Sequence, residues 1–268
     1  MGAEPELVVV DGPDEAASTA AERIATVLAD ATARRGRADW ATTGGSSVVG
    51  IYRRLVAAPL RDAVPWPAVH VWWGDDRFVP RDHPLSNVKP LDDILLGIGL
   101  TEEGVAGGEA PGVPLAVEHL HPFRTTEAIG ESRGAAWCAA DLAKELAGAH
   151  LPMAGSSPIF DLLLLGVGAD GHLLSVFPGS AALGAGELAL AIPAPGHIEP
   201  HVERVTLNPA VVGAARQVLV VATGASKAPV LREVFGETHD PARWPAQLAR
   251  RTGATWILDI AAAADIPR

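Results

Sequence analysis

The chain has 268 residues and a formal net charge of −11 at pH 7, with 48% hydrophobic and 20% charged residues. This composition predicts a globular protein with one large α/β domain or two small ones, and it excludes a disordered chain. The negative charge argues against a nucleic-acid or anionic-membrane surface, and no apolar run is long enough to span a bilayer. The single cysteine, Cys138, cannot form a disulfide within the chain, which favours a cytoplasmic location.

Segments with the pattern of strands alternate along the chain with segments of helical periodicity. The predicted strands are Leu7–Val10, Arg37–Ala41, Val69–Trp73, Ile159–Leu165, Glu203–Leu207, Val218–Ala222 and Ala254–Leu258. The predicted helices are Asp14–Arg35, Val48–Ala57, Pro90–Leu100, Thr125–Leu146, Pro209–Ala215 and Lys227–Phe235. This alternation predicts an α/β fold: a mostly parallel, Rossmann-like sheet flanked by helices on both faces, in one domain over residues 1–268.

Three segments between these elements are less regular. Asp75–Asn87 is predicted to be a long polar loop, and Thr101–Pro114, rich in Gly and Glu, is predicted to be an exposed excursion. The pattern of Leu183–Ile192 does not decide between helix, strand and loop.

The most informative stretch is Phe160–Gly179, in which a nearly continuous aliphatic strand ends in a glycine turn. Gly166 and Gly168 permit a tight turn and a close approach of the backbone. Asp170 and His172 follow at the carboxyl end of the strand, where open α/β sheets bind their ligands. A carboxylate and an imidazole at this place indicate a proton-transfer site. The alternative is a histidine that only caps a backbone group.

Two more loops fall at the same end of a parallel sheet. In Thr42–Ser47, two glycines and hydroxyl side chains precede a helix, which offers backbone N–H groups to an anion. In Asp75–Arg77, two carboxylates and a guanidinium follow a strand, and the same segment continues to Asn87. These groups suit sugar hydroxyls, a phosphate or a developing charge. The alternatives are an ordinary N-cap turn and a solvated charged loop.

A fourth loop carries a lysine. Gly224–Lys227 is a glycine turn before a helix, with Lys227 in the first turn. A cation at a helix N-terminus opposes the helix dipole, so this placement favours a phosphate ligand nearby. Arg204, within the predicted strand Glu203–Leu207, supplies a second positive charge or is an ordinary surface arginine.

The sequence lacks the patterns that are typical of several other kinds of site. His119 and His121 have no nearby cysteine and no histidine four residues away, so no metal site is expected. The sequence has no Gly-x-Ser-x-Gly elbow, and the loop at Thr42–Ser47 is not closed by Gly-Lys-Ser/Thr. The Gly-x-Gly at Gly166 lacks the third glycine of a dinucleotide site.

Taken together and in order, the four loops resemble those of the 6-phosphogluconolactonase family, within the glucosamine-6-phosphate isomerase/deaminase superfamily. The resemblance is carried by TTGGSS (42–47), WWGDDRFVPRDHPLSN (72–87), FDLLLLGVGADGHLLSVFPGS (160–180), ERVTL (203–207) and TGASK (223–227). It implies hydrolysis of 6-phospho-D-glucono-1,5-lactone to 6-phospho-D-gluconate, a step of the oxidative pentose phosphate pathway. The reaction that the resemblance implies requires no redox cofactor and no metal.

The resemblance also implies roles for individual residues. His172 is expected to be the general base, Asp170 to orient it, and Arg77 to stabilise charge on the lactone oxygen or hold the ring. Asp75 is expected to bind substrate hydroxyls. The remaining substrate-binding residues are expected to be Gly44, Gly45, Ser46, Ser47, Asn87, Gly168, Arg204 and Lys227, with Ser46 or Ser47, Arg204 and Lys227 around the phosphate.

Two features qualify the resemblance. The family usually has Asp-Glu-Arg where this chain has Asp-Asp-Arg, so the role of Asp76 is open. The sister deaminases place a Glu for ring opening where this chain has Phe177, which favours the lactonase. The alternatives are a deaminase-like isomerase and a non-catalytic sugar-phosphate-binding regulator. The expected partner is a phosphorylated sugar lactone, bound by a cytoplasmic monomer or weak homodimer, with no nucleic acid or membrane.

Overall fold

A computed structural model describes residues 4–98 and 112–267. Seven strands of this part of the chain form one sheet in the order β1-β12-β11-β8-β2-β3-β5, and each neighbouring pair is parallel. The strands are β1 (Glu6–Val10), β2 (Ala38–Thr42), β3 (Val69–Trp73), β5 (Leu120–His121), β8 (Leu162–Leu165), β11 (Gln217–Ala222) and β12 (Ala254–Asp259). The predicted α/β fold with a mostly parallel sheet is confirmed.

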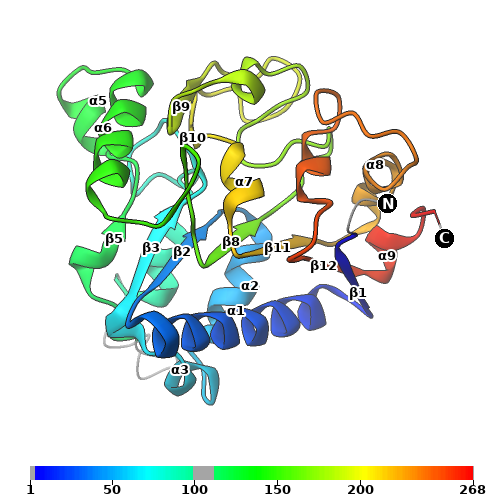
Figure 1. The fold of residues 1–268 in the computed structure, drawn as a ribbon, viewed down its shortest axis with the longest axis horizontal. Coiled ribbons are helices and arrows are strands. Elements are labelled where there is room, and N and C mark those ends of the chain that lie inside the picture. Colours follow the sequence, from blue (N-terminus) through cyan, green and yellow to red (C-terminus); the bar gives the residue numbers. More distant parts are fainter. Residues whose placement is uncertain (1–3, 99–111, 268) are drawn as a thin grey trace.

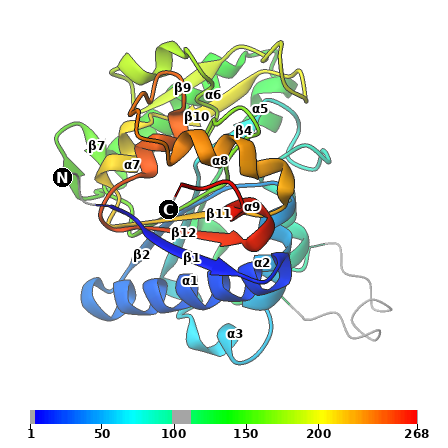
Figure 2. The same cartoon turned by 90° about the vertical axis from the view of Figure 1, so that its right-hand side faces the viewer.

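Helices cover both faces of this sheet (Figures 1 and 2). The long α1 runs along one face beside α2, and α7 and α8 lie on the other face. The helices are α1 (Pro13–Arg35), α2 (Ser46–Leu55), α3 (Leu60–Ala63), α5 (Thr125–Gly130), α6 (Ala135–Gly148), α7 (Ala210–Ala214), α8 (Ala228–Val234) and α9 (Ile260–Ala263). Within residues 4–98 and 112–267, no helix is long and apolar enough to cross a membrane.

Small side chains let α1 pack closely on its neighbours. Ala16, Ala20 and Ala21 are completely buried on its inner face. On α2, Gly50 lies opposite Ala17, and a Cβ at Gly50 would come within 3.1 Å of the Ala17 methyl group. The alanine-rich sequence of α1 therefore reflects close packing between helices rather than helix propensity alone.

A second, antiparallel sheet lies near the carboxyl ends of the parallel strands. It has the order β4-β10-β9, formed by β4 (Asp75–Arg77), β10 (Arg204–Leu207) and β9 (Ala189–Ile192). The prediction of a loop throughout Asp75–Asn87 is therefore wrong at its start, because β4 pairs with a strand more than 120 positions later, Arg77 opposite Arg204. The undecided segment Leu183–Ile192 ends as β9.

Two predicted helices are shorter than expected. Thr125–Leu146 is not one helix: α5 ends at Gly130 and α6 begins at Ala135, and between them Ser132 has a φ of +54°, which an α-helix does not accept. Of Pro90–Leu100, the described residues are helical from Pro90 to Leu95, with Leu91–Leu95 as a single π-type turn, and residues 96–98 are not helical. Residues 99–111, which include most of the predicted excursion Thr101–Pro114, lie outside the described residues.

The strand order locates the ligand-binding edge of the sheet. From β2 the chain continues to β3 on one side, whereas from β8 it continues to β11 on the other side. The connections therefore diverge between β2 and β8, and open α/β sheets bind ligands beyond the carboxyl ends of strands at such a switch point. The loops that follow β2 and β8 are Thr43–Gly45 and Gly166–His172.

The amino ends of the same two strands are joined by buried charges. Asp161 accepts a hydrogen bond from the Asp39 backbone N–H (2.9 Å) and ion pairs with Arg35 (2.8 Å) and Arg216 (3.2 Å). Asp161 is only 5% exposed. Because the backbone of β2 depends on this carboxylate, the network fixes β2 beside β8 at the end opposite to the ligand-binding edge.

Replacing Asp161 with Ala should lower the free energy of unfolding by about 1–3 kcal/mol, because it leaves the buried Asp39 N–H without its acceptor and removes ion pairs to two partly exposed arginines. Urea unfolding followed by circular dichroism measures this loss. Asp30→Ala, which breaks an exposed ion pair on α1, is the matched control and should cost less than about 0.5 kcal/mol. Equal stability of the two variants would contradict this role of Asp161.

Candidate active site

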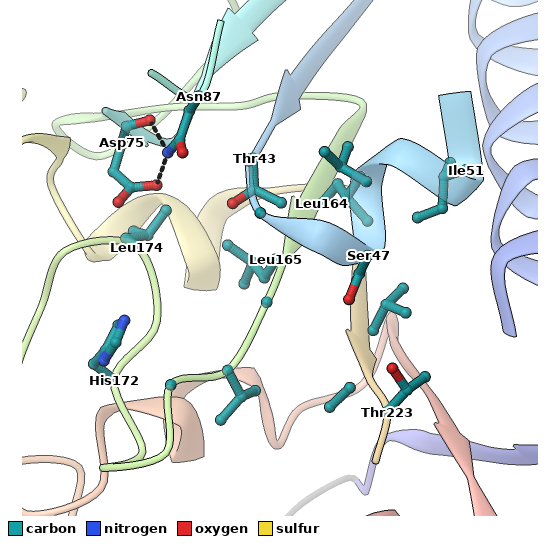
Figure 3. A pocket seen from close by; sticks show the side chains of 18 of the residues that line it. Thr43, Ser47, Ile51, Asp75, Asn87, Leu164, Leu165, His172, Leu174 and Thr223 are labelled. Carbon is teal, nitrogen blue, oxygen red and sulfur yellow. Dashed lines mark hydrogen bonds between the residues drawn. The ribbon is translucent and has the colours of Figure 1, made fainter. Parts of the chain in front are cut away.

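A cavity of about 280 Å³ opens at the carboxyl ends of β2, β8 and β11, where the strand order places a site (Figure 3). Most of the residues predicted from the sequence line it: Gly44, Gly45, Ser47, Asp75, Arg77, Asn87, Gly168, His172 and Lys227. Asp170 and Arg204 do not line it directly. The side chain of Ser46 lies outside the described part of the structure. In Figure 3, Asp75 and Asn87 point toward each other, and His172 lies apart from Ser47 and Thr223 on the far side of the pocket.

The turn after β8 holds His172 against Asp170. His172 Nδ1 lies 2.5 Å from Asp170 Oδ1, and the Gly168 N–H donates to the His172 carbonyl (2.9 Å). A Cβ at Gly168 would fall 2.0 Å from His172 Nδ1, so only glycine leaves room for the imidazole. Gly171 has a φ of +82°, which glycine adopts without strain. Because Asp170 accepts from Nδ1, the lone pair of the neutral ring lies on Nε2.

A second histidine contacts the same carboxylate. His197 Nε2 lies 2.8 Å from Asp170 Oδ2, and Phe177 packs against both imidazoles, with ring centroids 4.8 Å from His172 and 5.8 Å from His197. Burial raises the pKa of Asp170, but the hydrogen bonds from both histidines and the charge of His172 outweigh it and hold the pKa well below its usual range. Asp170 therefore stays ionised at neutral pH. No pattern in the sequence pointed to His197.

The start of β4 brings a carboxylate into the pocket and fixes it from two sides. Asp75 accepts a hydrogen bond from Ser175 Oγ (2.6 Å) on Oδ2 and one from Asn87 Nδ2 (3.2 Å) on Oδ1. Gly44 packs on Asn87 so closely that a Cβ would lie 2.0 Å from the amide oxygen. Arg77 donates from Nη1 to the Leu85 carbonyl (2.7 Å). Two of the predicted loops thus meet at this side of the pocket, and Ser175 is a further contributor that the sequence did not indicate.

Asp76 turns away from the pocket and is fully buried. Its carboxylate accepts hydrogen bonds from the backbone N–H groups of Arg77 and Asn87 (both 2.7 Å) and from Ser86 Oγ (3.2 Å). Burial raises the pKa of Asp76 to about 7, against the two backbone hydrogen bonds that lower it. Asp76 therefore holds together the loop that carries Arg77 and Asn87.

The side of the pocket formed by Gly45, Ser47 and Lys227 suits an anion. Gly45, with a φ of +89°, precedes α2, whose first turn carries Ser47 and directs N–H groups at the cavity. Lys227 Nζ donates to the Val167 carbonyl (2.7 Å). Burial lowers the pKa of Lys227, and the charge of Asp170 opposes this shift. The lysine turn is held in place because the Gly224 N–H donates to the Asp259 carboxylate (2.9 Å and 3.0 Å).

Arg204 lies behind the pocket wall rather than in it. It pairs with Arg77 across the β4–β10 register, is 4% exposed, and donates from Nη2 to the Pro200 carbonyl (2.8 Å). Burial, and then the charge of Arg77, lowers the pKa of Arg204. Its Nη1 is buried and has no hydrogen-bond partner among residues 4–98 and 112–267. The alternative of an exposed surface arginine is therefore wrong.

The fold and this pocket define an α/β enzyme whose site lies at the carboxyl edge of a parallel sheet. Residues 11–257 match the family described as glucosamine-6-phosphate isomerases/6-phosphogluconolactonase, and the chain belongs to that family.

Individual relatives cover nearly the whole chain. The 6-phosphogluconolactonase of Streptomyces coelicolor is 35% identical over 273 residues, covering 100% of this chain and 97% of that protein. The 6-phosphogluconolactonase of Synechocystis sp. is 32% identical and covers 88% of each chain. The solved 6-phosphogluconolactonase from Trypanosoma cruzi superposes with a TM-score of 0.84 at 25% identity, covering 100% of this chain and 99% of that one. A monomeric glucosamine-6-phosphate deaminase, 14% identical with a TM-score of 0.74, shares the fold.

The raised pKa of Asp76 makes stability depend on pH. Between about pH 4 and pH 7 the folded protein keeps a proton that the unfolded chain has released, so stability should fall as the pH rises through this window. Asp76→Asn retains an acceptor and cannot ionise. The stability of the wild type relative to this variant should therefore decrease between pH 5 and pH 7, by at most about 1.4 kcal/mol per pH unit. Chemical unfolding of both proteins at several pH values measures the difference. A difference that is constant over this range would contradict the titration.

Proposed function

We propose that this chain hydrolyses 6-phospho-D-glucono-1,5-lactone to 6-phospho-D-gluconate, in the oxidative pentose phosphate pathway, with His172 as the general base. The observation that carries the proposal is the contact between His172 Nδ1 and Asp170 Oδ1 (2.5 Å) at the edge of the pocket. This contact leaves Nε2 of His172 to accept a proton, and imidazole is basic enough for this at neutral pH. The family membership and the relatives named above support the same reaction.

The reaction requires proton transfer in both directions. His172 Nε2 accepts a proton from water while the water oxygen bonds to the lactone carbonyl carbon, C1, and the carbonyl electron pair moves onto its oxygen. The tetrahedral intermediate then collapses, the bond from C1 to the ring oxygen breaks, and His172 returns the proton to that oxygen. The new carboxylic acid releases its proton to solvent. The ionised Asp170 stabilises the imidazolium that forms between these two steps.

Two groups on the β4 side are suited to the sugar ring. Arg77 has N–H donors beyond the one bound to Leu85, and a guanidinium there stabilises negative charge on the lactone oxygen. Asp75 has acceptor capacity beyond its hydrogen bonds with Ser175 and Asn87, which suits it to sugar hydroxyls. Because both oxygens of Asp75 are already fixed, its orientation is set before a substrate arrives.

The phosphate of the substrate is assigned to the side of the pocket formed by Gly45, Ser47 and Lys227. Backbone N–H groups at Gly44, Gly45 and Ser47 and the ammonium of Lys227 provide donors and positive charge at the N-terminus of α2. Arg204, which the sequence analysis expected beside the phosphate, lies behind Arg77 on the β4 side and adds its charge there instead.

Phe177 weighs against a deaminase. Its ring packs against His172 at the sequence position where the sister enzymes carry a ring-opening carboxylate, and a phenyl group cannot transfer protons. The ordered pair of Asp170 and His172 weighs against a binding protein without catalytic activity. Water and the substrate suffice for the reaction, which therefore requires no cofactor. The proposal includes a cytoplasmic monomer or weak homodimer.

Replacing His172 with Ala should lower kcat by about 10²–10⁴-fold and change KM little, because the base acts in the transition state. The assay couples freshly made lactone to 6-phosphogluconate dehydrogenase, with spontaneous opening in buffer subtracted. His239→Ala, at an exposed position, is the control and should keep wild-type rates. Full activity of the His172 variant would rule out its role as the base.

Replacing Lys227 with Met keeps the length of the side chain and removes its charge. We expect KM to rise about 10-fold or more with a smaller change in kcat, as for the loss of a hydrogen bond from a charged group to phosphate. Lys144→Met, at an exposed position of α6, should leave both constants unchanged. An unchanged KM for the Lys227 variant would place the phosphate elsewhere.

A further inference from the structure

His197 lies on the hairpin that connects β9 to β10, 27 positions after Asp170 in the sequence, and the fold brings its imidazole to the catalytic turn. β10 pairs on its other side with β4, which carries Asp75 and Arg77. The antiparallel sheet therefore contributes to the pocket twice. Strand β4 provides the groups suited to the sugar ring, and the hairpin provides a contact to Asp170, the partner of the proposed general base.

The hairpin is held by several hydrogen bonds. His201 Nδ1 lies 2.6 Å from the Pro195 carbonyl, and Arg204 Nη2 donates to the Pro200 carbonyl (2.8 Å). At the base of the hairpin, the Phe78 N–H donates to the Glu203 carbonyl (2.8 Å). These contacts fix Pro195 and Pro200 on either side of His197 and join the hairpin to the segment after β4, so the fold sets the position of His197.

The contact from His197 places a hydrogen-bond donor on the second oxygen of the Asp170 carboxylate. A carboxylate rotates in a broad torsional well, so hydrogen bonds to one of its oxygens alone leave its plane poorly defined. Asp170 Oδ1 accepts from His172 Nδ1 and from the His172 backbone N–H (3.2 Å), whereas the donor to Oδ2 is His197 Nε2. The Asp170 side chain is only 16% exposed. Phe177 lies against both imidazoles and separates them. The arrangement defines the rotation of the carboxylate and, through it, the orientation of His172.

We propose that His197 is a positioning residue for the reaction: by donating to Asp170 Oδ2, it fixes the carboxylate in the plane that holds His172 in its Nδ1–H form. The inference rests on the proposed function, because it assigns His197 to the same base. His197 does not line the pocket and acts through Asp170. Its removal should therefore affect the transition state and leave substrate binding almost unchanged.

If His197 only formed a surface contact with Asp170, a different result would be expected. The His197 side chain is 53% exposed, and exposed charge pairs contribute little to stability. On that reading, loss of the imidazole changes neither kcat nor the state of the His172 ring. The two readings are therefore separable by kinetics and by the tautomer of His172.

The kinetic test compares two variants of His197. His197→Ala should lower kcat about 10-fold or more and leave KM within about 2-fold of the wild type. His197→Gln, which places an amide N–H near the position of Nε2, should recover most of kcat. Glu203→Ala, at an exposed position of the same hairpin, is the control and should match the wild type. An unchanged kcat in His197→Ala, or equal losses in the Ala and Gln variants, would overturn the proposal.

A double-mutant cycle tests whether the effect passes through Asp170. In an Asp170→Asn background, His197→Ala should lower kcat by less than about 2-fold, because the carboxylate it positions is gone. A full additional loss in that background would refute the assignment.

A spectroscopic readout separates this inference from the proposed function. Long-range ¹H–¹⁵N correlation spectra of the imidazoles report which nitrogen carries the hydrogen, with His172→Ala used to assign the signals. The wild type should show His172 in the Nδ1–H form at a pH where the ring is neutral, and His197→Ala should show a mixture of both forms. This result does not depend on turnover, so it stands even if the lactone is not the substrate. An unchanged His172 tautomer in His197→Ala would overturn the proposal.

Discussion

The backbone of Gly74 joins the two sheets, and the geometry of the pocket depends on this junction. Its N–H donates to the Thr42 carbonyl at the end of β2 (2.8 Å), and its carbonyl accepts from the Leu207 N–H at the end of β10 (2.8 Å). A Cβ at this position would lie 2.6 Å from Leu174 Cδ2, so the Leu174 side chain would have to shift to admit one. Glycine thus leaves room for Leu174 where the chain passes from β3 to β4. The next residue, Asp75, is delivered over the carboxyl ends of the parallel strands.

The junction also explains how an acidic chain can hold an anionic substrate. With a net charge of −11, the protein as a whole repels anions, and binding depends on the local field in the pocket. Arg77, Arg204 and Lys227 lie in or directly behind the pocket wall, and two of them are brought together only because β4 pairs with β10. The acids nearby are held in hydrogen bonds, which limits how far their charge opposes a phosphate.

The parts of the site that the sequence predicted are those encoded within short segments. The turn from Gly166 to His172 combines a buried strand, glycines and an Asp-Gly-His within a few residues, and the structure places these residues together as expected. The contacts that were missed connect distant segments: Ser175 reaches Asp75 across 100 positions, and His197 reaches Asp170 from the stretch before Glu203, where the sequence pattern predicted no element. Pairing of β4 with β10 was missed for the same reason, because three polar residues do not show the pattern of a strand. Long-range pairing leaves no local periodicity, and this limits what one sequence can predict.

Three aspartates near the pocket differ in role because they differ in surroundings. Asp75 faces the cavity with both oxygens fixed by neutral donors. Asp76 is buried behind it among backbone N–H groups and a hydroxyl, and it organises the loop without touching the pocket. Asp170 is shared by two imidazoles, which keep it charged. This distribution gives a physical reading of the one departure from the family pattern. At position 76 the acid binds backbone groups of its own loop, so a shorter side chain is compatible with the site as long as those donors are reached.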